Sequence, residues 1–230
     1  ASCLVGSEMC IRDSSLVGSS KSETTEVNLE VVTLPKEFIS LTDVTANNLI
    51  GRRALAYLKR RGITKQDILK YQIGYCEDGP YSNMIVIPSY DEKGTLNYFT
   101  SRGFEEFSRS KYKNPNVSRN IIPFELFINW NVPIILCEGP FDMMAIKRNV
   151  IPLLGKNIQD KLKKKLVTSQ VQKIYIALDK DAIKQALSFC EELLNEGKEV
   201  YLVELQDKDP SEMGFENFTK LIQTTQPLTF

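Results

Sequence analysis

Residues 133–146 read PIILCEGPFDMMAI and join two patterns at one turn. The run IILC has the length and composition of a buried strand, and it ends on an acid, Glu138. Gly139 and Pro140 then turn the chain, and Pro140 suits the first position of a helix. Asp142 falls in the first helical turn, where the helix dipole favours an anion. A strand that passes directly into a helix predicts one unit of an α/β fold.

The same alternation continues towards the end of the chain. Short apolar runs alternate with segments of helical period, which predicts a parallel sheet covered on both faces. The expected strands are 134–138, 150–155, 173–179 and 199–205, and the expected helices are 140–148, 157–170, 182–196 and one that begins near Pro210.

The segment ahead of this unit mixes helices with a hairpin. Thr42 begins a stretch of helical period that Gly62 ends, and Thr64 has the position of an N-cap before a second, short helix. Two apolar runs with a turn between them predict a hairpin. Its strands are expected at 84–88 and 96–102, and its turn at 91–94.

Composition divides the chain into four parts. Residues 1–33 are rich in Ser, Gly and Thr and contain the near-repeat CLVGS and SLVGS, which predicts disorder. We expect residues 1–20 to be foreign to the native sequence. An α+β subdomain follows at 34–130 and an α/β domain at 131–210. Residues 211–230 complete the chain with a helix that we expect to be truncated.

Composition also excludes several kinds of chemistry. The 230 residues contain no His, so the chain has no imidazole base and no His-ligated zinc. Five Cys without CxxC spacing predict reduced, buried thiols and no zinc site. Lys plus Arg equal Asp plus Glu at 29 each, so any binding of nucleic acid has to be local. No apolar stretch approaches the roughly 20 residues that span a bilayer, which predicts a cytoplasmic protein with no membrane contact.

Acids gather where the predicted parallel strands end. Glu138 ends one strand, and Asp179 and Asp181 end another. The carboxyl ends of parallel strands lie at one edge, so we expect these acids and Asp142 to lie close together. Residues two apart on an extended segment point the same way, so Asp179 and Asp181 should present both carboxylates to one point. Carboxylates that repel one another need a hard cation such as Mg²⁺ or Mn²⁺, which predicts metal-assisted phosphoryl transfer.

The pair of motifs CEGPFD and LDKDA resembles the Toprim domain, the acidic metal site shared by primases, topoisomerases and some nucleases. The stretches YLKRRGI, IGYCEDGPYSNMIVIPSYDEKGTLNYFTSRG, SKYKNP and KDPSE are similar, in order and spacing, to the catalytic core of DnaG-type primases, above all those encoded by phages. The likeness covers residues 34–215. It implies a Toprim domain with a Rossmann-like parallel sheet, preceded by a smaller α+β primase subdomain.

The resemblance implies roles for individual residues. The implied metal ligands are Glu138, Asp142, Asp179, Asp181, Asp207 and Asp209, of which Glu138, Asp179 and Asp181 are catalytic. The implied nucleotide- and DNA-binding residues are Arg102, Lys111, Lys113 and Asn114. Asp209 has a second interpretation, because Asp209-Pro210-Ser211-Glu212 has the pattern of a helix cap with Pro at the first position.

The implied activity is that of a nucleotidyltransferase, a primase-type RNA polymerase that uses Mg²⁺ and a single-stranded DNA template to make RNA primers during phage replication in the host cytoplasm. Its partners would be the template, ribonucleoside triphosphates and a replicative helicase. The family's zinc-binding module, its helicase domain and its Lys ahead of the Toprim strand have no counterpart here. The chain is thus either a fragment or is completed by other chains. A Toprim nuclease of the OLD or RNase M5 type and a non-catalytic module that binds single strands remain open alternatives.

Overall fold

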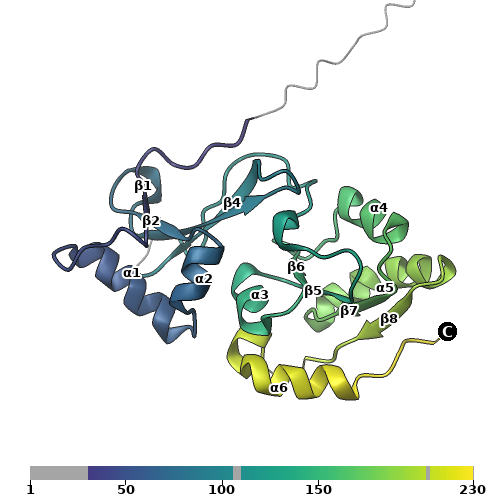
Figure 1. Cartoon of the computed structure of the whole chain (residues 1–230). Helices are drawn as coiled ribbons and strands as arrows, with labels where there is room; N and C mark the ends of the chain where they lie inside the picture. The colour runs from purple at the N-terminus through teal and green to yellow at the C-terminus, as the bar shows by residue number, and fades with distance from the viewer. Residues whose placement is uncertain (1–30, 106–109, 206–207, 230) are drawn as a thin grey trace, which may run out of the picture. The chain divides into compact units, whose positions relative to one another are not determined.

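The structure is a computed structural model that describes residues 31–105, 110–205 and 208–229. The chain from Val31 onward forms one compact unit with two four-stranded sheets, the first antiparallel and the second parallel (Figure 1). Disorder was predicted for residues 1–33, of which residues 1–30 lie outside the described ones.

The antiparallel sheet has the strand order β1-β2-β3-β4. Its longest pair is the predicted hairpin, formed by β3 (Met84–Tyr90) and β4 (Leu96–Gly103). Strands β1 (Phe38–Ser40) and β2 (Gly74–Cys76) extend the sheet and were not predicted. Three residues are too few to carry a readable alternation, so the sequence gives no sign of them.

Helices α1 (Leu49–Arg60) and α2 (Lys65–Lys70) belong to the same part of the chain. The first begins later than predicted because Asn48 caps it, with its side-chain oxygen accepting the N–H of Gly51. The buried residues of α1 are Gly51, Ala54 and Leu58. The second begins at the predicted cap, Thr64.

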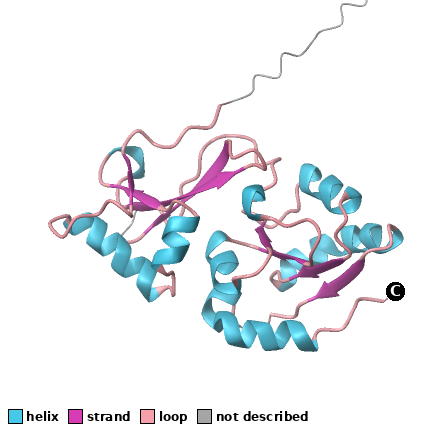
Figure 2. Cartoon of the chain, in the orientation of Figure 1, coloured by secondary structure: helices cyan, strands magenta, loops and turns pink. Residues whose placement is uncertain are grey.

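The parallel sheet has the order β6-β5-β7-β8, with every neighbouring pair parallel, which confirms the predicted fold class. Helices connect its strands, as Figure 2 shows. The strands are β5 (Ile134–Cys137), β6 (Val150–Pro152), β7 (Lys173–Ile176) and β8 (Glu199–Leu202). The helices are α3 (Pro140–Ile146), α4 (Asp160–Thr168), α5 (Lys180–Asn195) and α6 (Pro210–Thr224).

Strand β5 is apolar throughout because it is buried on both faces. Ile135 and Cys137 join a core that includes residues of α3 and α6, whereas Ile134 and Leu136 join a core with α4 and α5. The first of these cores also contains Leu58 of α1 and residues of the hairpin. One continuous core therefore supports both the α+β part and the acid-bearing edge of the parallel sheet.

The cysteines of the described residues, Cys76, Cys137 and Cys190, are buried, as predicted, and their reduced state stays a prediction. Burial raises the pKa of Cys76 to about 12 and that of Cys190 to about 11. Among the helices that the structure describes, none combines the length and the apolar composition that a membrane crossing requires.

Candidate metal and nucleotide site

Glu138 and Asp179 meet at the carboxyl edge of the parallel sheet. Glu138 follows β5 directly, and its Oε1 accepts the backbone N–H of Asp179 at 3.3 Å. Burial, together with the charge of the Asp179 carboxylate, raises the pKa of Glu138, although the N–H bond partly offsets this. The fold thus brings together two acids that lie 41 residues apart in the sequence.

The sequence predicted that the strand continues to Asp181, but it does not. Strand β7 ends at Ile176, and Asp179 is the N-cap of α5, with φ −61° and ψ 155°. The helix begins at Lys180, so Asp181 is its second residue. The expectation that Asp179 and Asp181 lie two apart on an extended segment is therefore wrong. The side chain of Asp181 lies outside the described residues, as does Asp207.

Asp142 lies in the first turn of α3, where the sequence predicted it. Its Oδ2 accepts the N–H of Gly139 at 3.2 Å, and its Oδ1 accepts the N–H of Ser211 at 3.3 Å. Burial, and then the charge of Asp209, raise the pKa of Asp142 to about 6. Burial favours the neutral form of the Asp142 carboxyl, and the negative charge of Asp209 adds to this effect, so a cation bound nearby would lower the pKa again.

Asp209 is the N-cap of α6, as one of its two interpretations required. Its Oδ1 accepts the N–H of Glu212 at 2.9 Å and the hydroxyl of Ser211 at 2.7 Å. Its charge also acts on Asp142. The capping role therefore does not exclude a supporting role at a metal, which stays a prediction.

These four acids, Glu138, Asp142, Asp179 and Asp209, are called the acid cluster from here on. Within the side chains that the structure describes, no group of three or more His, Cys, Asp or Glu is arranged to hold a metal ion. The donors are carboxylate oxygens, which Mg²⁺ and Mn²⁺ prefer, and the Glu138 and Asp142 carboxyls have raised pKa values. In kind of ligand and in charge, the acid cluster fits a hard divalent cation.

A cavity of about 360 Å³, the arginine pocket, lies between α1 and the end of β4. The guanidinium carbons of Arg61 and Arg102 lie 4.7 and 5.4 Å from the centroid of the Phe141 ring, next to Asp142 in the chain. The Nε atoms of both arginines are buried without a hydrogen-bond partner. Buried donors without an acceptor are costly, and guanidinium groups that line a cavity are charged donors that suit an anion. The pocket's basic and aromatic lining is Arg60, Arg61, Arg102, Lys111, Tyr57 and Phe104, and Glu105 also lines it.

The segment after residue 109 runs along β4 as an added edge. The N–H of Gly103 donates to the carbonyl of Lys111 at 3.2 Å, and a single bridge pairs Arg102 with Tyr112. The guanidinium of Arg102 also donates to the Tyr112 hydroxyl. This pairing places Lys111 in the arginine pocket beside Arg102. Two of the four residues predicted to bind nucleotide or DNA thus lie together.

The other two are engaged elsewhere. The Nζ of Lys113 donates to the carbonyl of Pro80 at 2.6 Å and lies 5.0 Å from the centre of the Tyr81 ring. The side-chain oxygen of Asn114 accepts the N–H of Ser101 at 3.2 Å, which pins the segment to β4. Neither residue lines the arginine pocket, so a direct role in nucleotide binding stays a prediction for both.

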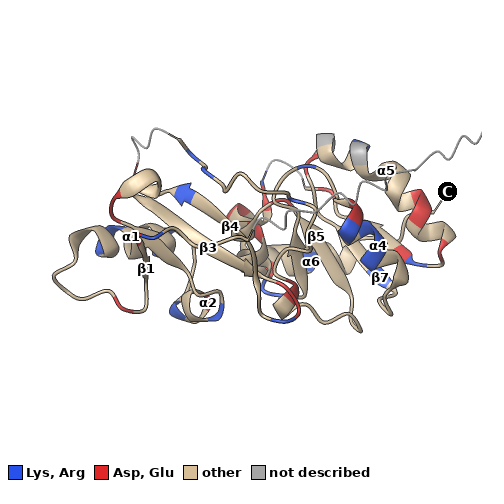
Figure 3. Cartoon of the chain, turned by 90° about the horizontal axis from the view of Figure 1, so that it is seen from above, with Lys and Arg blue, Asp and Glu red and all other residues tan. Residues whose placement is uncertain are grey.

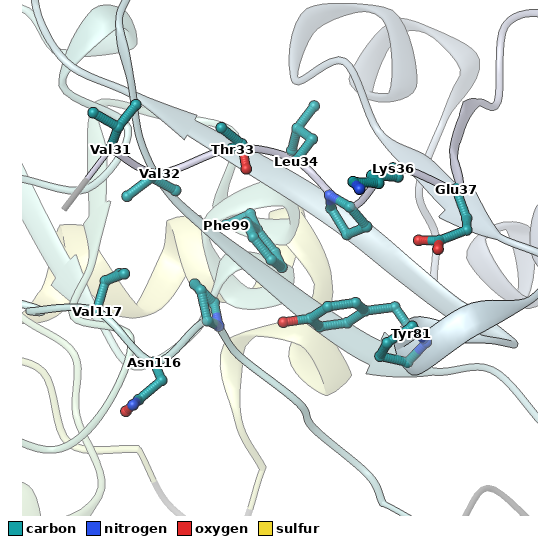
Figure 4. A pocket seen from close by; sticks show the side chains of 13 residues that line it. Val31, Val32, Thr33, Leu34, Lys36, Glu37, Tyr81, Phe99, Asn116 and Val117 are labelled. Atoms are coloured by element: carbon teal, nitrogen blue, oxygen red, sulfur yellow. The ribbon is translucent and has the colours of Figure 1, made fainter.

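A larger cavity, of about 420 Å³, lies under the segment 31–37, with the rings of Tyr81 and Phe99 in its wall (Figure 4). Valine, leucine and proline side chains make up much of its lining, and it contains none of the predicted site residues. Cavity size alone therefore does not select the candidate site, whereas the charge of the lining and the donors without acceptors favour the arginine pocket.

Helix α4 carries a run of lysines (Figure 3) that the sequence assigns to a solvated face. Lys161 and Lys164 are exposed, but Lys165 lies 3.3 Å from Glu92 and 3.4 Å from Glu125, which is 5 % exposed. Lys165 thus ties the hairpin turn to the α/β part.

Two curated relatives are similar to the chain. The uncharacterized protein MG010 of Mycoplasma genitalium is 32 % identical over 139 residues, which are 56 % of this chain and 62 % of that protein. The uncharacterized MG010 homolog of Mycoplasma pneumoniae is 31 % identical over 175 residues, 70 % of this chain and 80 % of that protein. The chain belongs to the MG010 family. It spans less than two thirds of the M. genitalium protein.

Residues 135–213 of this MG010-family chain match the family model described as Toprim-like, a span that includes the whole acid cluster. Its fold is similar to the Aquifex aeolicus primase with zinc-binding and RNA polymerase domains (TM-score 0.66, 24 % identity, 82 % of this chain and 58 % of that one). It is also similar to a DnaG primase catalytic domain bound to single-stranded DNA (TM-score 0.68, 16 % identity, 82 % of this chain and 78 % of that one). The Escherichia coli primase catalytic core gives comparable values (TM-score 0.67, 17 % identity, 79 % of this chain and 75 % of that one). The predicted fold, a DnaG-type primase catalytic core with a Toprim domain, is confirmed.

Sequence reasoning missed Arg61, Tyr57 and Ser211. Arg61 lies in the RRGI stretch, but its place beside Phe141 depends on how α1 packs near α3. The edge of the Tyr57 ring meets Phe141 at 6.3 Å between centroids. Ser211 lies in KDPSE, where only the cap pattern was readable.

Proposed function

We propose that this chain is a DNA primase, a nucleotidyltransferase that makes RNA primers on a single-stranded DNA template with the help of Mg²⁺ or Mn²⁺. The observation that carries the proposal is the first turn of α3. Phe141 stacks against two arginines of a cavity with unpaired donors, and the next residue, Asp142, belongs to the acid cluster. Carboxylates for a metal beside guanidinium groups for phosphates are the parts that phosphoryl transfer requires.

Glu138, Asp179 and Asp181 would hold the metal, with Asp142, Asp207 and Asp209 as supporting acids. When bound, Mg²⁺ lowers the pKa of the primer 3′-hydroxyl and offsets charge on the triphosphate. Arg61, Arg102 and Lys111 would bind and orient the phosphates, each as a charged donor. Backbone hydrogen bonds hold Asp142 in place, which would fix its position relative to the bound phosphates. No side-chain nucleophile is needed.

The partners follow from this activity. The template is single-stranded DNA and the substrates are ribonucleoside triphosphates. A replicative helicase and a zinc-binding module would be supplied by other chains or by parts of a longer protein.

We place the protein in the cytoplasm, in the host cell if a phage encodes it. The division into a primase subdomain at 34–130 and a Toprim domain at 131–210, after a start at 1–33 and before a last helix at 211–230, belongs to the same proposal.

A primer-synthesis assay tests the function. The chain is incubated with a single-stranded template of mixed sequence, labelled ribonucleotides and Mg²⁺ or Mn²⁺, and the products are separated by size. We expect metal-dependent dinucleotides and longer products that EDTA abolishes. Asp179→Ala should reduce them at least about 100-fold, because a metal ligand is lost. Asp160→Ala, at an exposed acid in the first turn of α4, is the matched control and should retain activity.

Other outcomes would assign the site to another class. Metal-dependent cleavage of the template without incorporation of nucleotides would identify a nuclease that uses the same acids to activate water. Binding of single strands that is unchanged in EDTA, with neither synthesis nor cleavage, would identify a non-catalytic module. Full synthesis by Asp179→Ala would contradict the assigned site.

A further inference from the structure

Ser211 lies where the acid cluster and the arginine pocket meet. Its hydroxyl donates to Oδ1 of Asp209 at 2.7 Å and accepts from Nη2 of Arg61 at 3.3 Å. Its backbone N–H donates to Oδ1 of Asp142 at 3.3 Å. One residue of α6 therefore contacts two carboxylates and a guanidinium that reaches it from the end of α1.

The backbone of α6 explains how Ser211 reaches these partners. The helix is interrupted at Gly214, whose φ of +74° and ψ of 168° lie outside the helical region and suit glycine. The first turn, which starts at Pro210, can therefore follow the position of Asp142 rather than the axis of the longer second segment. The N–H of Ser211 has no partner within the helix at this position, so it is available to Asp142.

The hydroxyl of Ser211 has a defined direction. It carries one proton, and that proton is donated to the Asp209 carboxylate, so its lone pairs are left for Arg61. A hydroxyl that donates to a carboxylate is polarised and becomes a better acceptor. Arg61 is thus held through Nη2 and by the Phe141 ring, while its buried Nε keeps an unused donor.

We propose that Ser211 is a positioning residue that fixes the Arg61 guanidinium relative to the acid cluster, so that both act on one metal-bound triphosphate. This inference rests on the proposed function. It predicts that the hydroxyl matters to nucleotide binding only through Arg61. A residue that merely fastened α6 to α1 would affect stability and leave nucleotide affinity unchanged.

The chain offers a matched control on the same helix. The hydroxyl of Thr219 accepts from Nη2 of Arg148 at 3.0 Å, an arginine–hydroxyl contact of the same kind. Neither residue lines the arginine pocket or belongs to the acid cluster. Thr219→Ala therefore removes an equivalent contact without reaching the site.

The test measures binding of the non-reactive probe α,β-methylene-ATP with Mg²⁺ by titration calorimetry. Ser211→Ala should weaken binding roughly tenfold, the usual size for a hydrogen bond to a charged group. Ser211→Thr, which keeps the hydroxyl, should stay near the wild-type affinity, and Thr219→Ala should not change it. In Arg61→Ala, the further change Ser211→Ala should have no additional effect. Thermal unfolding of each variant checks that it is folded.

Failure of the inference can be distinguished from failure of the proposed function. If the wild-type chain binds the probe but Ser211→Ala binds it equally well, or if the two substitutions weaken binding independently, Ser211 does not position Arg61. If the wild-type chain does not bind the probe with Mg²⁺, the proposed function fails and the inference fails with it.

Discussion

The acid cluster and the arginine pocket adjoin the same turn of α3, but they are held in different ways. Backbone N–H groups bind Glu138 and Asp142, and the acids lie at one edge of the parallel sheet or cap the helices that follow it. The arginines come from the end of α1 and from β4, stack on Phe141, and donate hydrogen bonds to the side chains of Ser211 and Tyr112. The acids thus depend on one sheet, whereas the arginines depend on the packing of two parts of the chain. Substitutions should therefore separate the two regions.

The largest effect is expected at the acid cluster. Glu138→Gln removes a carboxylate charge but keeps an oxygen that can accept the N–H of Asp179, so the fold should persist. We expect primer synthesis to fall at least about 100-fold, because a neutral amide is a poor ligand for Mg²⁺. Initial rates over a Mg²⁺ titration measure this. Rates within twofold of wild type would remove Glu138 from the metal site.

The next effect should be confined to the arginine pocket. Phe141→Leu removes the ring on which Arg61 and Arg102 stack, and it should cost about 1–3 kcal/mol of stability together with roughly tenfold in affinity for Mg²⁺-bound α,β-methylene-ATP. Phe189→Leu is the control, because Phe189 is also buried, at 3 % exposure, but belongs to the core beneath α4 and α5. Equal losses of affinity in both variants would show that stacking at Phe141 is not specific to the site.

A smaller effect should appear in the pH dependence of stability without metal. The pKa of Asp142 is raised from 3.8 to about 6 in the folded protein, so the folded state binds more protons than the unfolded state between these values. In EDTA, the contribution of Asp142 is therefore a loss of stability as pH rises from about 4 to about 6. Asp209→Asn keeps an oxygen to cap α6 but removes the neighbouring charge, and it should reduce this loss by about 1 kcal/mol.

Urea unfolding at a series of pH values between 4 and 8 measures that difference. Glu216→Gln, a charge removed elsewhere on α6, is the control and should leave the profile unchanged. Identical profiles for Asp209→Asn and the wild type would show that Asp209 does not act on Asp142.

The smallest effects should distinguish two neighbouring lysines. Lys111→Ala should weaken binding of the nucleotide probe several-fold, because Lys111 lines the arginine pocket. Lys113→Ala should change it less than twofold, because Lys113 is engaged with Pro80 and Tyr81. The same calorimetric titration measures both. A larger loss in Lys113→Ala than in Lys111→Ala would place the phosphates elsewhere on the loop.

The parallel sheet could be predicted from the sequence because each of its strands is an apolar run that leads into a helix, and the Gly139-Pro140 turn marks one of these boundaries. The position of Glu138 followed from that. The start of α5 could not be placed in the same way, because LDKD suits both an extended end and a helix cap. In the structure, Asp179 is the N-cap of α5, and Asp181 lies within the helix.

The arginine pocket could be predicted only in part. Arg102 and Lys111 were identified through a resemblance to known proteins and not through any period in the sequence. Arg61 and Ser211 are 150 residues apart, and their contact depends on how α1 and α6 pack in the folded chain. Local sequence patterns do not predict such long-range contacts, so these two residues could be identified only from the structure.

The central claim is that the acid cluster and the arginine pocket act on one metal-bound triphosphate. A double-mutant cycle of Glu138→Gln and Arg102→Ala, read by the affinity for α,β-methylene-ATP in Mg²⁺, tests it most directly. We expect each substitution to weaken binding roughly tenfold. The double variant should lose clearly less affinity than the product of the two single losses, because two groups that contact the same ligand are energetically coupled. Losses that multiply would mean that the two regions bind independently and would contradict the account.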